Sequence, residues 1–260
     1  MKTVIKISLT AFGAISLFAC TVPEYTFMTY NVGAFGKYTN STGMIARMVN
    51  EFSPDALGLQ ELDSCNRRHD TYQLADLVDS LAWSGGYEFA KALDFAGGSY
   101  GIGCATRERE VKNAYTLLLS KFDGAEARAL AVLETEDFVY ATTHLDHTSE
   151  NARLGQYSEL MHFMDSCSFE KPVFLCGDFN SAPDSPFMQE VFRRWVRLTG
   201  DSYTYDSRNP HICIDYIFAL KSPKYDFKAE EVRADFNTGE VTEASDHLPL
   251  ITKVKVLRAL

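Results

Sequence analysis

The stretch Pro172-Val173-Phe174-Leu175-Cys176-Gly177-Asp178-Phe179-Asn180 joins a short apolar run to two polar side chains. Residues 172–176 are bounded by turn residues, which is typical of a β-strand. Asp178 and Asn180 follow directly at the predicted end of that strand. A helix cap or a turn would explain this pair, but a carboxylate beside an amide also suits a catalytic site. This stretch therefore predicts a sheet whose strand ends carry polar groups.

Similar apolar runs rich in Val, Ile, Leu, Phe and Tyr extend this pattern along the chain. They predict strands at residues 25–30, 56–60, 87–92, 115–120, 128–134, 138–145, 214–220, 227–234 and 248–256. Apolar residues at helical spacing predict helices over 44–52 and 74–81; a third begins at Ser149, and a fourth follows Ser185. Strands outnumber helices, so we expect an α/β fold of two packed sheets with helices outside.

Other polar residues also lie where predicted strands begin or end. Each has a structural explanation when it is considered alone, because histidines and acidic residues at strand ends often serve only the fold. Together they provide the ligands, the base and the hydrogen-bond donors that phosphoester hydrolysis requires. The set comprises Asn31, Glu61, His144, Asp178, Asn180, Asp215, Asp246 and His247.

The residue types in this set suggest a role for each group. Mg²⁺ is bound through one or two carboxylates and keeps several waters, so Glu61 and Asp246, with Asn31 nearby, would form an open metal site. Asp178 can accept the proton of an attacking water, and Asn180 can orient that water. Of the remaining residues, the histidines His144 and His247 can donate to the charge that develops on phosphate.

The order of these motifs resembles the endonuclease/exonuclease/phosphatase superfamily, which has the pancreatic-type deoxyribonuclease fold. The resemblance runs from about residue 25 to the C-terminus. It implies a four-layered α/β sandwich, in which two mainly antiparallel sheets pack face to face with helices outside. The motifs are Thr29-Tyr30-Asn31, Leu59-Gln60-Glu61, Thr143-His144-Leu145, Gly177-Asp178-Phe179-Asn180, Ile214-Asp215-Tyr216 and Ser245-Asp246-His247-Leu248-Pro249.

The resemblance also implies functional roles. It implies a Mg²⁺ ion, with Mn²⁺ as the alternative, bound by Glu61 with Asn31 and Asp246 close by. By the same resemblance, the remaining residues act on water and phosphate: Asp178 as general base, Asn180 as its orienting partner, His247 as a phosphate contact fixed by Asp215, and His144 as a second residue facing the phosphate.

Residues 89–103 resemble exported Bacteroides-type members of the superfamily. Tyr100 and Arg128 are candidate substrate-binding residues, with an aromatic prop and a surface charge as the alternatives. His147 follows His144 by three residues, but its side chain need not face the same partners, and we assign it no direct role. We expect loops 63–72, 94–110 and 200–212 to determine which substrate is bound.

The N-terminal segment has the composition of a secretory signal. Lys2 and Lys6 precede an apolar run from 7 to 19 that is too short to span a bilayer. Residues 17–20 resemble the lipobox of bacterial lipoproteins, which implies a lipid on Cys20. The alternative is a buried first strand or helix. We expect residues 1–20 to be a lipoprotein signal peptide, residues 21–260 to be the enzyme domain, and the protein to be exported and membrane-anchored in the bacterial cell envelope.

The charge of the chain bears on its substrate. The formal net charge is −10, and loss of residues 1–20 removes two lysines and no acidic residue, which leaves −12. Such a surface repels polyanions. A small phosphoester or a lipid head group is therefore favoured over nucleic acid, which stays the alternative, and a non-catalytic surface binding protein is a third. We expect a monomer. Whether Cys65 pairs with Cys104 is left open, and Cys176 and Cys213 are expected to be buried thiols.

Overall fold

The computed structural model describes residues 22–35 and 41–259, so the predicted signal peptide and Cys20 lie outside the described residues. Sheet A has six strands in the order β11-β12-β1-β2-β4-β3, and only the β1–β2 pair is parallel. Its strands are β1 (Glu24–Asn31), β2 (Ala56–Ser64), β3 (Tyr87–Phe95), β4 (Gly98–Thr106), β11 (Tyr225–Val232) and β12 (Leu250–Arg258).

Sheet B repeats this arrangement with its own six strands. Their order is β5-β6-β7-β8-β10-β9, and only the β7–β8 pair is parallel. The two sheets are thus mainly antiparallel, as predicted. The strands are β5 (Asn113–Leu119), β6 (Arg128–Glu134), β7 (Val139–His144), β8 (Val173–Asp178), β9 (Trp195–Arg197) and β10 (Asp215–Leu220).

An aromatic cluster fills the space between the two sheets. Phe27 of sheet A lies 4.4 Å from Phe174, 5.0 Å from Tyr140 and 5.2 Å from Phe138, measured between ring centroids, and these three partners belong to sheet B or its margin. All four side chains are fully buried. Because aromatic pairs contribute beyond the area that they bury, this cluster fixes how the sheets face each other.

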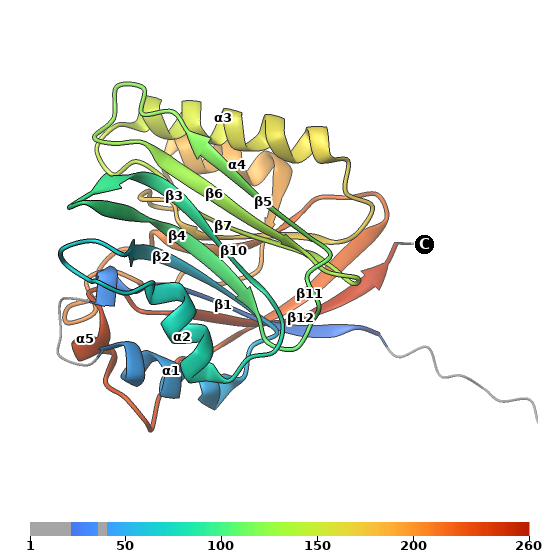
Figure 1. The fold of residues 1–260 in the computed structure, drawn as a ribbon. Helices are drawn as coiled ribbons and strands as arrows, with labels where there is room; N and C mark the ends of the chain where they lie inside the picture. Colours follow the sequence, from blue (N-terminus) through green and yellow to red (C-terminus); the bar gives the residue numbers. More distant parts are fainter. Residues whose placement is uncertain (1–21, 36–40, 260) are drawn as a thin grey trace, which may run out of the picture.

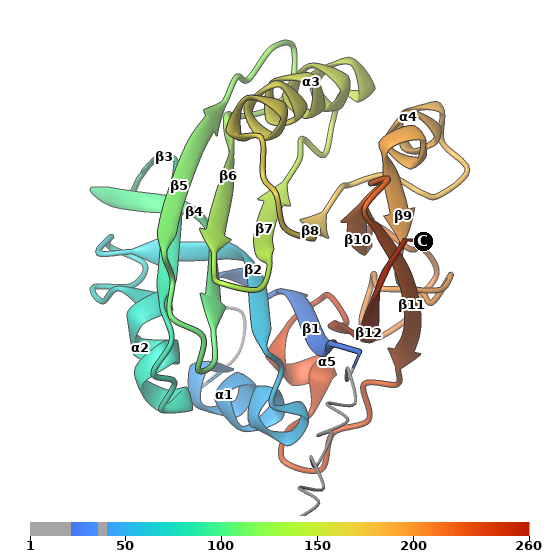
Figure 2. The ribbon, with the colours of Figure 1, turned by 90° about the vertical axis from the view of Figure 1, so that its right-hand side faces the viewer.

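Helices cover the outer faces of both sheets and complete the four layers. Helices α1 (Ser41–Phe52), α2 (Gln73–Leu81) and α5 (Val241–Ala244) cover sheet A, whereas α3 (Glu150–Cys167) and α4 (Pro186–Arg194) cover sheet B. Figures 1 and 2 show the two groups on opposite sides of the molecule. A short 3₁₀ helix, η1 (Gly33–Phe35), follows β1. Ser149 and Ser185 cap α3 and α4, as the sequence predicts.

Strand β4 corrects the expectation that residues 94–110 form a loop. Glycines are typical of turns, but the glycines of β4 allow neighbouring segments to pack closely against this strand. A Cβ on Gly101 would lie 2.1 Å from the carbonyl oxygen of Ala90, and a Cβ on Gly103 would lie 2.5 Å from the Leu74 side chain. Glycine is therefore needed where β3 and α2 approach this strand.

The cysteines of the described chain are all reduced. Cys65 is exposed beyond the end of β2, whereas Cys104 is buried on β4 opposite Gly58, so these two do not pair. Cys176 and Cys213 are buried free thiols, as predicted. In the part of the chain that the structure describes, no helix is both long and apolar enough to cross a bilayer.

Candidate active site

The strand pairing brings the predicted site residues to one edge of the two sheets. In sheet B, β7 and β8 run parallel, so His144 pairs with Asp178, and Asp215 at the start of antiparallel β10 pairs with the same residue. In sheet A, parallel β1 and β2 place Asn31 beside Gln60. Strand ends from both sheets therefore meet at a single edge.

A cavity of about 380 Å³ lies at this edge. Most of the predicted site residues line it, and Asn31 and Asp215 are buried at its margin, where they contact residues that do line it. Its lining consists of Glu61, Tyr100, Glu126, Arg128, His144, His147, Asp178, Asn180, Tyr205, Ile214, Asp246 and His247. Residues that are far apart in the sequence thus converge on one cavity.

Asp178 occupies the centre of the polar network. Its Oδ2 accepts a hydrogen bond from Asn31 Nδ2 at 3.1 Å, and its Oδ1 accepts one from the backbone N–H of Asn180 at 2.8 Å. Burial and the neighbouring carboxylate of Asp215 raise the pKa of Asp178 to about 7, although His247 opposes the increase. A carboxylate with a raised pKa accepts a proton readily near neutral pH.

His247 is held between two carboxylates. Its Nδ1 lies 2.9 Å from Asp215 Oδ2, and its Nε2 lies 3.7 Å from Asp178 Oδ2. Burial alone would lower the pKa of His247, but Asp215 and Asp178 raise it to about 10, so the ring is cationic. Ser245 fixes the segment, because its hydroxyl donates to the Asn31 carbonyl at 2.6 Å and accepts from the His247 N–H at 3.2 Å.

His144 faces the same carboxylate from the other side. Its Nε2 lies 3.5 Å from Asp178 Oδ2. Burial lowers the pKa of His144 well below its usual range, and the positive charge of Arg128 lowers it further. The two histidines of the site therefore differ in charge, with His144 neutral and His247 cationic.

Glu61 is turned toward the cavity by a local irregularity of β2. The register of the β2–β4 pair shifts between Leu59 and Leu62, and Glu61 has a φ of 59°. Such a bulge redirects one side chain. Asn31 Nδ2 donates to Glu61 Oε1 at 3.1 Å, while Asn31 Oδ1 accepts from the backbone N–H of Gly33.

Two groups of donors around the cavity suit a divalent cation. Asp178, Asp215 and His247 each offer a ligand atom within 4.8 Å of the others, but all three are buried and already engage one another. Glu61 and Asp246 are only partly buried and line the same cavity. Because Mg²⁺ keeps several of its waters, the Glu61 and Asp246 carboxylates fit a hydrated Mg²⁺ better.

Arg128 and Tyr100 both line the cavity. The Arg128 side chain is only 3% exposed and forms an ion pair with Glu126, so it is not a solvated surface charge. Burial, followed by the charge of Glu61, raises the pKa of Tyr100, so its hydroxyl stays protonated. Both side chains therefore share the lining of the cavity that contains Asp178, His144 and His247.

Several lining residues carry little signal in the sequence. Glu126 precedes Arg128 by two positions, and this spacing of opposite charges was the available signal. Tyr205 pairs with His247 through an isolated β-bridge, with ring centroids 5.0 Å apart. It lies in the predicted loop 200–212, where no periodic pattern marks a single residue. Ile214 is the apolar member of the lining.

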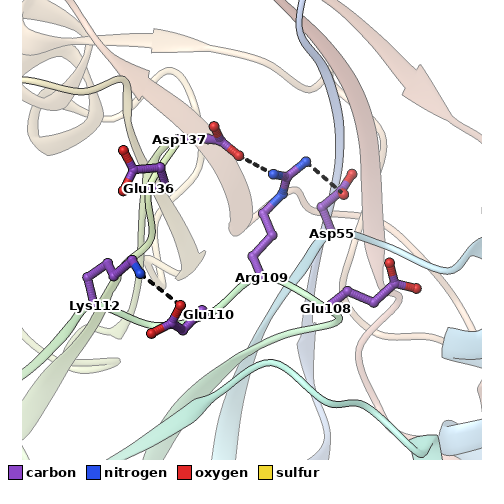
Figure 3. Close-up of a pocket in the computed structure, with 7 residues that line it drawn as sticks. All are labelled: Asp55, Glu108, Arg109, Glu110, Lys112, Glu136 and Asp137. Carbon is purple, nitrogen blue, oxygen red and sulfur yellow. Dashed lines mark hydrogen bonds and ion pairs between the residues drawn. The ribbon is translucent and has the colours of Figure 1, made fainter.

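A second charged cavity lies away from this edge and has a different character (Figure 3). Arg109 lies between Asp55 and Asp137, and Lys112 pairs with Glu110. Asp55 precedes β2, whereas Glu61 lies near the opposite end of that strand. The two basic side chains are thus already paired, and none of the predicted site residues contributes to this cavity.

Comparison with known proteins agrees with the fold described above. The model of the Endonuclease/Exonuclease/phosphatase family matches residues 28–247. No curated protein sequence matches the chain. Among solved structures, an endonuclease/exonuclease/phosphatase from Bacteroides vulgatus has a TM-score of 0.70 at 20% identity, over 90% of this chain and 100% of that one.

Two further solved structures have the same fold. A mannosyl-6-phosphatase from Bacteroides thetaiotaomicron VPI-5482 has a TM-score of 0.67 at 19% identity, over 90% of this chain and 99% of that one. The catalytic domain of human Nocturnin, with a bound sulfate anion, has a TM-score of 0.68 at 20% identity, over 90% and 94% of the respective chains. The likeness therefore extends over nearly the whole described chain.

Proposed function

The chain belongs to the Endonuclease/Exonuclease/phosphatase family, and we propose that it is a Mg²⁺-dependent hydrolase that cleaves a small phosphoester with water activated by Asp178. The observation that carries this proposal is the position of Asp178. Its carboxylate has a raised pKa, and its Oδ2 lies 3.5 Å from Nε2 of the neutral His144 and 3.7 Å from Nε2 of the cationic His247. That arrangement provides a base and phosphate-facing donors in one cavity.

Asp178 is the general base of the proposed reaction. The hydrogen bonds from Asn31 and from the backbone N–H of Asn180 hold its carboxylate in one orientation. Asn180 itself is fixed because its Nδ2 donates to the Leu145 carbonyl at 3.0 Å. Attack of water on phosphorus requires a proton acceptor at a fixed position, and these contacts provide it.

The histidines stabilise the charge that develops on the phosphoryl group. His247 is cationic, and Asp215 orients its ring through Nδ1, which leaves Nε2 to donate toward the cavity. His144 is neutral and lines the same cavity as His247. Donors that are fixed before reaction stabilise a transition state at little reorganisation cost.

The proposed metal site is formed by Glu61 and Asp246, with Asn31 in contact with Glu61. A bound Mg²⁺ would withdraw charge from the phosphoryl oxygens. The lining contains four carboxylates, of Glu61, Glu126, Asp178 and Asp246, and one arginine. An excess of carboxylates favours a divalent cation and disfavours a long polyanion, which supports a small substrate over nucleic acid.

Activity assays with Asp178→Asn test the proposal. The purified protein should hydrolyse p-nitrophenyl or bis-p-nitrophenyl phosphate with Mg²⁺ and lose turnover in EDTA. Because the amide cannot accept the proton, kcat should fall about 10²- to 10⁴-fold in Asp178→Asn. The matched control Asp226→Asn changes an exposed carboxylate on β11 and should retain full activity. A folded wild-type protein without Mg²⁺-stimulated turnover on a broad phosphoester panel would overturn the proposal.

A further inference from the structure

One wall of the active-site cavity carries a charged group that the proposed chemistry does not use. Arg128 begins β6, opposite the end of β7, and its side chain is 97% buried. Its Nη1 lies 2.9 Å from Glu126 Oε1, and its Nη2 lies 3.1 Å from His147 Nδ1. Among the described residues, Arg128 Nε has no hydrogen-bond partner.

These contacts determine the hydrogen-bonding character of the three residues. A guanidinium only donates hydrogen bonds, so His147 Nδ1 must accept, and the proton of the neutral ring lies on Nε2. His147 is exposed, and its Nε2–H is therefore a donor at the edge of the cavity. The Glu126 side chain is 35% exposed, and its carboxylate has further hydrogen-bond acceptor positions besides the one that Arg128 occupies.

The net charge of this wall decides which ligand it suits. Because the Arg128 charge is neutralised by Glu126, the pair offers no net attraction to a second phosphate, and Glu126 would repel one. An apolar group would cover Arg128 Nε, which is unpartnered within the described part of the chain, and the remaining acceptor positions of Glu126 without forming hydrogen bonds to them. The Tyr100 hydroxyl lines the same cavity and remains protonated. Donors and acceptors thus alternate on a wall that is neutral overall.

We propose that Glu126, Arg128, His147 and Tyr100 form a subsite for the hydroxyl groups of a sugar, so that the substrate is a phosphorylated sugar. This inference rests on the proposed hydrolase function. Each sugar hydroxyl both donates and accepts, and a neutral pair of carboxylate and guanidinium satisfies both roles on adjacent hydroxyls. The subsite lies beside His144, so the phosphate of such a sugar reaches Asp178 while its hydroxyls contact this wall.

Paired substrates test the inference. Hydrolysis of mannose 6-phosphate is compared with hydrolysis of phenyl phosphate. The methyl phosphodiester of each compound is assayed as well, so that both phosphomonoesters and phosphodiesters are tested. Glu126→Gln removes the charged acceptor at a partly exposed loop position. The ratio of kcat/KM for the sugar ester to that for the phenyl ester should fall about tenfold or more, because the site's polar groups discriminate hydroxyls. Glu108→Gln, in the second cavity, is the matched control and should leave this ratio unchanged.

Equilibrium binding separates this inference from the hydrolase proposal. Isothermal titration of mannose 6-phosphate should show about tenfold weaker binding to Glu126→Gln and to His147→Ala than to the wild-type protein. Wild-type turnover of phenyl esters without turnover or binding of sugar esters would overturn the sugar subsite and leave the hydrolase intact. If Glu126→Gln lowers kcat/KM equally for the sugar ester and the phenyl ester, Glu126 only holds Arg128 in position and does not bind hydroxyl groups. That result would also overturn the inference. A folded protein that binds the sugar phosphate but cleaves no ester would instead contradict the hydrolase.

Discussion

Three residues of the active-site edge have backbone conformations that few side chains adopt. Gly177 has a φ of 137°, and a Cβ there would lie 1.9 Å from the carbonyl oxygen of Thr143, so only glycine can precede Asp178. Asn180 and Glu61 have φ values of 48° and 59°. Non-glycine residues in this region are uncommon and concentrate at functional sites. The unusual backbone points the carboxylates and the amide toward one cavity.

Asp146 illustrates how a single buried carboxylate organises the neighbouring loops. Its oxygens accept four hydrogen bonds, from the Ala125 N–H, from the N–H and hydroxyl of Thr148, and from the Ser149 N–H. Burial alone would raise the pKa of Asp146, but these hydrogen bonds outweigh it and hold the pKa well below its usual value.

The lowered pKa predicts a pH dependence of stability. The ionised form of Asp146 stabilises the fold fully above its unfolded pKa of about 3.9, and this contribution is lost as pH falls below that value toward the folded pKa. In Asp146→Asn, the free energy of unfolding should be lower at pH 7 and should change less between pH 5 and pH 3. Urea titrations at several pH values measure both effects. Parallel pH curves for the two proteins would contradict the assignment.

At the scale of secondary structure, close contact between strands of opposite sheets depends on glycine. Gly58 of β2 faces Cys176 of β8, and a Cβ on Gly58 would lie 2.2 Å from the Cys176 Sγ and 2.9 Å from Thr142 Oγ1. Next to it, Gln60 Nε2 donates to Thr142 Oγ1 at 2.8 Å and so links β2 to β7. Gln60 directly precedes Glu61 on β2, so these contacts help to set how close the Glu61 segment comes to sheet B.

We therefore predict that Gly58→Ala destabilises the protein through overpacking, by about 1–3 kcal/mol. Cys176→Ala removes the sulfur atom that the new methyl group would meet. The double variant should recover part of the loss, with a coupling energy of about 0.5–3 kcal/mol. Urea unfolding of the two single variants and the double variant completes this cycle. If the effects of the two single substitutions on the free energy of unfolding simply add, the contact between residues 58 and 176 does not cause the destabilisation, and the prediction is wrong.

At the scale of the whole molecule, the active site is shared between two sheets. Asn31, Glu61, Asp246 and His247 come from sheet A or its margin, whereas His144, Asp178 and Asp215 come from sheet B. Correct distances between the two groups depend on the core that joins the sheets. The aromatic cluster around Phe27 is the central part of that core.

Phe27→Ala should therefore weaken the whole molecule. Removal of this fully buried ring leaves a cavity among Phe138, Tyr140 and Phe174, and we expect a loss of about 3–5 kcal/mol. Leu118, which is 62% exposed on β5, provides the control, and Leu118→Ala should change stability by less than about 0.5 kcal/mol. Chemical denaturation measures both values. Similar midpoints for the two variants would mean that the sheets are held together elsewhere.

The amino-acid sequence determined the fold class and pointed to the polar residues that the structure brings together around one cavity. Alternating and apolar runs identified most strands, because side-chain burial in a sheet leaves a periodic signal. Ser149 and Ser185 marked two helix starts through their capping chemistry. Strand β4 was missed, since its glycines serve contacts with β3 and α2 that no local pattern records.

Only the tertiary structure decided how the polar groups interact. Sequence order does not reveal that the Asp215 carboxylate meets the His247 ring at 2.9 Å. Nor does it reveal that burial lowers the pKa of His144 while Asp215 and Asp178 raise the pKa of the equally buried His247. It also does not reveal that Arg128 is enclosed by Glu126 and His147. The physical reason is that pKa values and ion pairing depend on distance and solvent exposure, which arise only when the two sheets pack together.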